Sequence, residues 1–274
     1  MNQEKRCQLE KHAEDIRVLT LDMISTFGMG HVGGCLSMAD LLSVLYFDKM
    51  NIDPADPQKF DRDRFVLSKG HGGPAVYASL ALRGYFPQEL CKTLNQPGTN
   101  LPSHCDRRRT PGIDMTTGSL GQGFSAAVGI ALGQRMQGLN AYTYAVVGDG
   151  ESQEGQVWEA AMLAGKQKLT NLIGFTDYNK LQIDGPADME PLADKWASFG
   201  WRVLEVDGHD VEAIADAIET AKTETEKPTM ILLHTTKGKG WSAIEGKVSC
   251  HVMQVSRETF QAVEQELRGG CHHA

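Results

Sequence analysis

Acidic and amide side chains follow two apolar runs of this chain, at positions where they could bind a metal ion and a phosphate group. The run Tyr144–Val147 is followed by a glycine-rich turn, Gly148–Gly155, which contains Asp149. Backbone N–H groups in a turn between a strand and a helix bind phosphate well, but a carboxylate would repel it. A divalent cation that bridges the two anions removes this conflict. The turn therefore predicts a metal-assisted phosphate site.

A second oxygen donor follows the next apolar run, Asn171–Thr176, which is succeeded by Asp177 and Asn179. Neighbouring parallel strands end at the same edge of a sheet, so Asp149 and Asn179 could meet there and bind Mg²⁺ or Ca²⁺. Residue types leave an alternative open, in which Asp149 caps a helix and Asn179 forms an Asx turn. A dinucleotide site is disfavoured, because Gly155 comes two positions too late for the G-x-G-x-x-G spacing.

Four histidines lie in loops rich in glycine, proline or polar residues: His31, His71, His104 and His251. Histidine can transfer protons near neutral pH and, when charged, can stabilise a developing alkoxide. A single loop histidine is more often a turn residue than a catalyst. We therefore treat all four as candidates, and we assign His12 and His209 to surface or structural roles.

The elements that must position these residues alternate between strand-like and helical patterns. Short apolar runs predict strands at 65–67, 142–147, 172–176, 202–206 and 230–233. Amphipathic or small apolar patterns predict helices at 7–27, from a cap at Ser37, 77–82, 121–132 (buried on nearly all sides), 157–168, 191–199 and 211–222. This alternation predicts an α/β fold, with a mostly parallel sheet and helices on both faces. We expect one domain over residues 1–268 and a flexible tail at 269–274.

Composition excludes several classes of protein. The net charge of −8 disfavours non-specific binding to nucleic acids or anionic membranes. Apolar runs are too short for a membrane span, and residues 2–6 are polar rather than the start of a signal peptide. The six cysteines are scattered, as expected for reduced thiols in a cytoplasmic protein. The 29 glycines exceed the average share of about 7% and indicate tight turns or close backbone approaches.

Several motifs together resemble the transketolase family, in the family's order from about residue 10 to residue 252. They are the thiamine diphosphate motif, formed by 148–150 and Asn179, and the flanking segments 67–72, 116–123, 154–155, 163–165 and 177–185. The resemblance implies the thiamine-diphosphate-binding fold and a bound thiamine diphosphate with Mg²⁺ or Ca²⁺. Two residues depart from the family, which commonly has proline where this chain has Val32 and Cys105. These departures leave the substrate range open.

The resemblance also implies roles for individual residues. It assigns the metal to Asp149, Asn179 and the carbonyl of Leu181, and it assigns the cofactor to His71, Gly118, Leu120, Gly150 and the same two metal ligands. It assigns catalysis to His31, His104, His251 and Glu154, of which Glu154 would link two cofactor sites across a subunit interface. Arg107, Arg108 and Arg109 fit either an entrance for phosphorylated sugars or a solvated loop.

The function implied by the resemblance is transfer of a two-carbon ketol unit from a ketose, expected to be phosphorylated, to an aldose. The sequence contains the diphosphate half of such an enzyme and leaves no room for the pyrimidine domain. We therefore expect a partner chain that supplies this domain, in a heterotetramer with two copies of each chain. Two alternatives stay open: a ketolase specialised for a branched or sulfonated sugar, and a non-catalytic paralogue that binds the cofactor.

Overall fold

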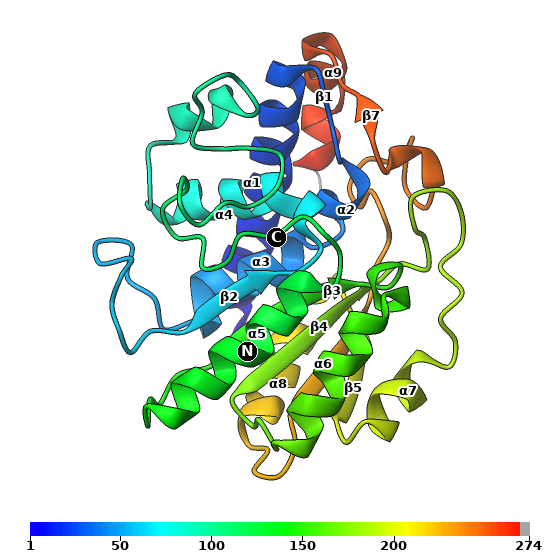
Figure 1. Cartoon of the computed structure of the whole chain (residues 1–274). Helices are drawn as coiled ribbons and strands as arrows, with labels where there is room; N and C mark the ends of the chain where they lie inside the picture. The colour runs from blue at the N-terminus through cyan, green and yellow to red at the C-terminus, as the bar shows by residue number, and fades with distance from the viewer. Residues whose placement is uncertain (269–274) are drawn as a thin grey trace.

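A parallel β-sheet forms the centre of the molecule in a computed structural model, which describes residues 1–268 (Figure 1). The predicted tail, 269–274, lies outside the described residues. Five strands pair in the order β2-β3-β4-β6-β5: β2 (Arg64–Leu67), β3 (Thr143–Gly148), β4 (Leu172–Tyr178), β6 (Thr229–His234) and β5 (Arg202–Asp207). All four pairings are parallel. The predicted α/β class and all five predicted strands are confirmed.

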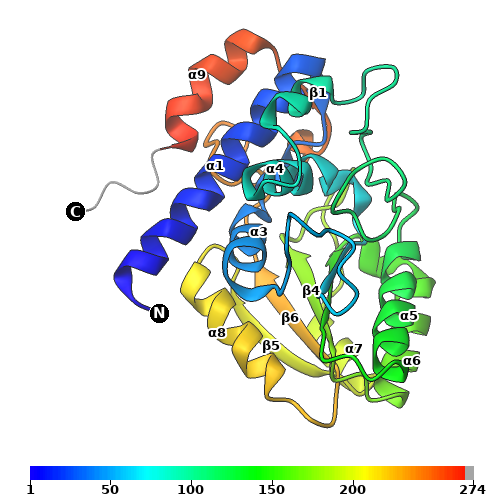
Figure 2. The ribbon, with the colours of Figure 1, turned by 90° about the vertical axis from the view of Figure 1, so that its left-hand side faces the viewer.

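Helices cover both faces of this sheet because its strands are apolar on both sides. In β3, Tyr144 and Val146 belong to one core, whereas Ala145 and Val147 belong to the other. The second core is covered by α5 (Gln122–Met136), α6 (Gly155–Lys166) and α7 (Leu192–Ser198). The first is covered by α1 (Gln3–Phe27), α3 (Ala39–Val44), α4 (Gly73–Arg83) and α8 (Val211–Lys222). Figure 2 shows α8 and α5 on opposite sides of the sheet.

Two helix predictions differ from the structure. Ser37 does not cap a helix: its Oγ donates to Asp177 Oδ2 at 2.7 Å, and α3 follows the short helix α2 (Gly33–Leu36). A long-range polar contact here replaces the local capping bond that the sequence suggested. Helix α5 was expected to be buried on nearly all sides, but Gly129 and Met136 are exposed on it. Its small apolar face is therefore open in the isolated chain.

Besides α2 and several short turns, three elements were not predicted, and two of them bring distant loops together. Strands β1 (Met29–Gly30) and β7 (Met253–Gln254) form an antiparallel ribbon, so the loops that carry His31 and His251 lie side by side. The third is α9 (Arg257–Leu267), capped by Ser256. Short 3₁₀ or π turns occur at 45–49, 70–72, 88–93, 151–153 and 248–250. No helix within residues 1–268 is long and apolar enough to cross a membrane.

Candidate active site

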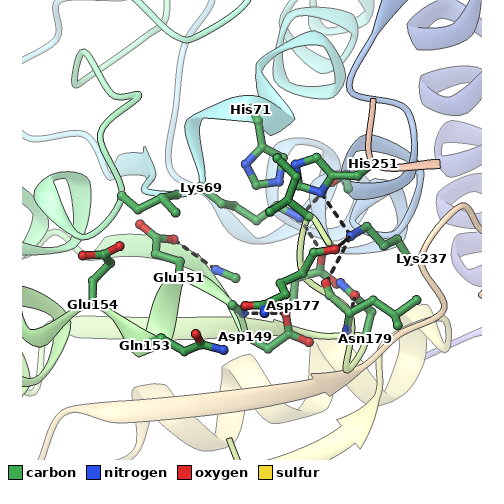
Figure 3. A pocket seen from close by; sticks show the side chains of 17 residues that line it. Lys69, His71, Asp149, Glu151, Gln153, Glu154, Asp177, Asn179, Lys237 and His251 are labelled. Atoms are coloured by element: carbon green, nitrogen blue, oxygen red, sulfur yellow. Dashed lines mark hydrogen bonds and ion pairs between the residues drawn. The ribbon is translucent and has the colours of Figure 1, made fainter. Parts of the chain in front are cut away.

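A cavity of about 260 Å³ opens at the carboxyl ends of β3 and β4, where the sequence predicted a site (Figure 3). Residues from the loops after β2, β3, β4 and β6, and from the loop before β7, line this cavity. The predicted residues that line it are His71, Leu120, Asp149, Gly150, Glu154, Asn179, Leu181 and His251. In parallel sheets ligands bind at this edge, so topology places these residues together.

The turns after β3 and β4 hold Asp149 and Asn179 in defined positions. Asp149 Oδ1 accepts from the Gly150 N–H at 2.7 Å, and Oδ2 accepts from the N–H of Lys180, whose φ is +63°. Asn179 Oδ1 accepts from the Leu181 N–H at 3.1 Å, which is an Asx turn. The turn expected by the alternative interpretation is therefore present. The same geometry also places both side chains at one cavity.

Burial gives Asp149 an unusually high pKa. Burial first, and then the neighbouring Asp177 carboxylate, raise the pKa of Asp149 to about 6. A cation placed beside this carboxylate would favour its charged form, so the residue is electrostatically suited to a divalent metal ion. Asn179 and the Leu181 carbonyl add neutral oxygens of the kind that Mg²⁺ and Ca²⁺ bind. The donor set therefore fits a divalent metal ion, which would take its further ligands from a phosphate group bound at the same turn.

The four candidate histidines form one cluster, of which His71 and His251 line the cavity. The ring centroid of His31 lies 5.4 Å from that of His71, 5.6 Å from that of His104 and 5.4 Å from that of His251. The centroids of His71 and His251 are 5.1 Å apart. Burial, together with neighbouring His104 and Lys237, lowers the pKa of His31 to about 4, and burial with Lys237 lowers the pKa of His251 to about 4. Both rings are therefore neutral at pH 7 in this chain, rather than the imidazolium ions considered from sequence.

Two lysines and an aspartate to which the sequence analysis assigned no role also line the cavity. Lys69 and Asp177 form a buried ion pair, and Lys69 Nζ donates to the Gly34 carbonyl at 2.8 Å. Burial alone would raise the pKa of Asp177. The Lys69 ammonium and the hydroxyl groups of Thr235 and Ser37 outweigh this effect and lower that pKa. Lys237 Nζ lies 3.1 Å from His251 Nδ1 and donates to the Leu181 carbonyl at 3.1 Å. The sequence signal that could have identified Lys69 is its position directly before Gly70–Gly72. For Lys237 the signal is its position in a glycine turn.

The remaining predicted residues border the cavity in different ways. A Cβ at Gly118 would contact the His104 ring at 3.7 Å, so a side chain there would enter the space beside the histidines. Leu120 and Glu154 are exposed at the rim, and Figure 3 shows Glu154 apart from the Lys69–Asp177 pair. Arg107 and Arg108 line a separate cavity with Gln58. The structure therefore does not bring these arginines to the lining of the main cavity.

Comparison with known proteins gives one consistent result. The family described as "Transketolase, thiamine diphosphate binding domain" matches residues 9–271. The chain is 58% identical over 268 residues to the 6-deoxy-6-sulfo-D-fructose transketolase subunit SqwG of Clostridium sp. (strain MSTE9), covering 96% of this chain and 98% of that protein. It is 38% identical to an apulose-4-phosphate transketolase subunit of Phocaeicola vulgatus, covering 94% and 93%.

The fold matches solved structures of longer enzymes. The transketolase of Campylobacter jejuni superimposes with a TM-score of 0.90 at 33% identity, over 97% of this chain and 43% of that one. The transketolase of Leishmania mexicana gives 0.89 at 34% identity, over 95% and 43%. The chain thus spans less than half the length of these solved enzymes. It spans nearly the whole length of the two subunits.

Proposed function

Because this chain belongs to the transketolase family, we propose that it is the thiamine-diphosphate-binding subunit of a two-chain transketolase. It transfers a two-carbon ketol unit from a ketose to an aldose, and residues 1–268 act as one diphosphate-binding domain. One arrangement carries the proposal: Asp149 and Asn179 line one cavity with His71 and His251, and the rings of His31 and His104 complete the histidine cluster. A non-catalytic paralogue has no need of the histidine cluster beside the metal turn.

In this proposal the residues divide into a cofactor end and a substrate end. Asp149, Asn179 and the Leu181 carbonyl hold Mg²⁺ or Ca²⁺. Gly150 and His71 contact the diphosphate, and Gly118 and Leu120 approach the pyrimidine through their backbones. Thiamine diphosphate, when bound, supplies the electron sink that allows a carbon–carbon bond next to the ketose carbonyl to break.

The substrate end consists of His31, His104 and His251. As neutral rings they can donate a hydrogen bond to a sugar hydroxyl from one nitrogen and accept a proton at the other. This lets them hold the substrate and transfer protons in both halves of the reaction. Glu154 is exposed at the rim of the cavity, so its side chain is accessible for the proposed role across a subunit interface.

The partner is a chain that carries the pyrimidine domain, in a complex with two copies of each chain. The names of the two similar subunits support a divided enzyme. For the donor we propose a sulfonated ketose, because the identity to the subunit named for 6-deoxy-6-sulfo-D-fructose is 58%, against 38% for the one named for apulose-4-phosphate. Phosphorylated ketoses are the competing donors.

The test is reconstitution. The chain is co-expressed with a pyrimidine-domain protein from the same genome, and ketol transfer is measured with thiamine diphosphate and Mg²⁺. Donors are 6-deoxy-6-sulfofructose, fructose 6-phosphate and a branched ketose phosphate at equal concentrations. We expect the highest kcat/KM with the sulfonated donor. Inactivity with every donor would contradict the catalytic assignment. A preference for a phosphate ester would contradict only the proposed sulfonated donor.

The metal ligand is tested on the same complex with Asp149→Ala. We expect loss of metal-dependent cofactor binding and at least a hundredfold loss of activity, because a ligand and its charge are both removed. Isothermal titration calorimetry with thiamine diphosphate, in Mg²⁺ and in EDTA, measures the binding. Asp184→Ala is the control, since Asp184 is an exposed carboxylate in the neighbouring loop after β4 that does not line the cavity. Full activity of the Asp149 variant would rule out the proposed metal site.

A further inference from the structure

A buried polar chain links two helices to the loop that carries Lys237, although its members lie outside the cavity lining. Arg17 of α1 forms an ion pair with Asp40 of α3, and both side chains are 8% exposed. Arg17 Nε also donates to the Leu36 carbonyl at 3.2 Å. Asp40 Oδ2 lies 2.8 Å from Nδ1 of His209, which follows β5. The carboxylate is therefore held between an arginine and a histidine.

The other nitrogen of His209 contacts the loop after β6. The backbone N–H of Thr236 donates to His209 Nε2 at 2.8 Å. Since Nε2 accepts this bond, it carries no proton, and the ring proton must be on Nδ1, facing Asp40. Asp40 thus fixes the orientation and the tautomer in which His209 can accept from the loop, much as carboxylates orient metal-binding histidines.

Thr236 is directly followed by Lys237, whose ammonium enters the cavity. Lys237 Nζ donates to the carbonyls of Leu181 and Gln182 at 3.1 and 2.9 Å. The same loop is fixed on its other side by the Gly238 N–H, which donates to the Gly33 carbonyl at 3.0 Å. The bonds from Thr236 to His209 and from Gly238 to Gly33 thus fix the two residues next to Lys237, in addition to the backbone bonds from Thr235 to Tyr178 and from Gly246 to Lys237.

We propose that His209 is a positioning residue: it holds the Thr236 backbone so that Lys237 presents its ammonium at the cofactor end of the cavity. Arg17 and Asp40 act through His209 by fixing its ring. The inference rests on the proposed function, because the group that Lys237 meets is taken to be the diphosphate. If these residues only fastened α1 and α3 to the sheet, replacing His209 would lower the overall stability without a specific effect on the Lys237 loop.

The test compares His209→Phe with His234→Phe in the complex with the partner chain. His234 is a matched control, since it ends β6 and its ring pairs with the Glu205 carboxylate at 2.8 Å rather than with the loop. Hydrogen–deuterium exchange is measured without cofactor over peptides covering 234–241. We expect at least tenfold faster exchange of the Thr236 region in the His209 variant and unchanged exchange in the control.

Cofactor affinity provides the second readout, from titration of thiamine diphosphate with Mg²⁺. We expect the Kd to rise about five- to tenfold in His209→Phe, the effect of losing one hydrogen bond that fixes the loop, while kcat at saturating cofactor changes less than twofold. His209→Gln, which keeps an acceptor, should recover part of the affinity. Unchanged exchange at Thr236 would overturn the proposal, as would a stability loss with unchanged Kd. If the wild-type complex binds no thiamine diphosphate, the proposed function fails, and the exchange experiment still decides whether His209 anchors the loop.

Discussion

At the scale of single residues, the charge state of the histidine cluster follows from burial. His31 and His251 are half-buried among other rings and near Lys237, and the pKa of each is lowered to about 4. Burial and Lys69 lower the pKa of His71 as well. A cluster of charged imidazoles would repel one another and Lys237. The neutral cluster therefore lets these rings accept protons from a substrate at physiological pH.

The same pKa shifts predict how the isolated chain responds to acid. The unfolded chain takes up protons at these histidines near pH 6.5, before the folded chain does near pH 4, so their contribution to stability is present above pH 6.5 and is lost as the pH falls toward 4. Asp149, with its pKa raised to about 6, contributes in the opposite direction. In the double variant His31→Gln/His251→Gln, the fall in Tm between pH 7.5 and 5.0 should be about 3 °C smaller, a modest effect because partly exposed charges are screened.

Differential scanning fluorimetry at pH 7.5, 6.0 and 5.0 measures this difference. His234→Gln is the control, because His234 is an exposed histidine outside the cluster. Equal falls in Tm for the wild type and the double variant would show that the cluster is not the origin of the acid sensitivity.

At the scale of elements, one buried carboxylate joins three of the glycine-rich loops. Glu151, which is 3% exposed, accepts from the Ser68 hydroxyl at 2.5 Å, the Gly121 N–H at 2.8 Å and the Gly148 N–H at 3.0 Å. Gly123 packs so closely that a Cβ would lie 2.7 Å from Ser68 Cα. Glu151 thus holds the end of β2, the start of α5 and the end of β3 in one arrangement.

Glu151→Ala should therefore loosen the whole cofactor end. Three buried donors lose their acceptor, and we expect the free energy of unfolding to fall by about 2–5 kcal/mol. The affinity for thiamine diphosphate should fall at least tenfold. Urea denaturation of the isolated chain and calorimetry of the complex measure the two effects. Glu154→Ala, three residues later and exposed, should leave the stability of the isolated chain within about 0.5 kcal/mol of wild type. Similar stability in both variants would refute the role given to Glu151.

The elements that could be predicted from sequence are those with a local signal. Apolar runs such as Phe65–Leu67 were sufficient for the strands, and parallel topology placed Asp149 beside the turn of Asn179. The two-residue strands β1 and β7 are too short for any periodicity, so the approach of His31 to His251 needed the structure. His209 was expected to have only a surface or structural role. Its bonds to Asp40 and Thr236 join segments that are distant in sequence, so no local pattern could reveal them.

At the scale of the whole molecule, the helices beside Glu154 present apolar side chains to solvent. On α6, Met162 is 48% and Leu163 45% exposed, and on α5 Met136 is 79% exposed. Leu120, at the rim of the cavity, is 37% exposed. Exposed apolar side chains on two packed helices are typical of a surface covered in an assembly. We interpret this surface of α5 and α6 as a contact for the rest of the proposed complex.

Leu163→Glu tests this interpretation at the level of assembly. Glutamate forms helices well, so α6 should persist and the Tm of the isolated chain should stay within about 2 °C of wild type. A charge buried without a partner at an interface should weaken assembly at least tenfold. Size-exclusion chromatography with light scattering, over a dilution series with the partner chain, measures assembly. Phe60→Glu, in the loop before β2 and 62% exposed, is the control and should assemble normally. If Leu163→Glu assembles as tightly as wild type, this face of α6 remains exposed in the complex, and Glu154 loses the position at an interface that its proposed role requires.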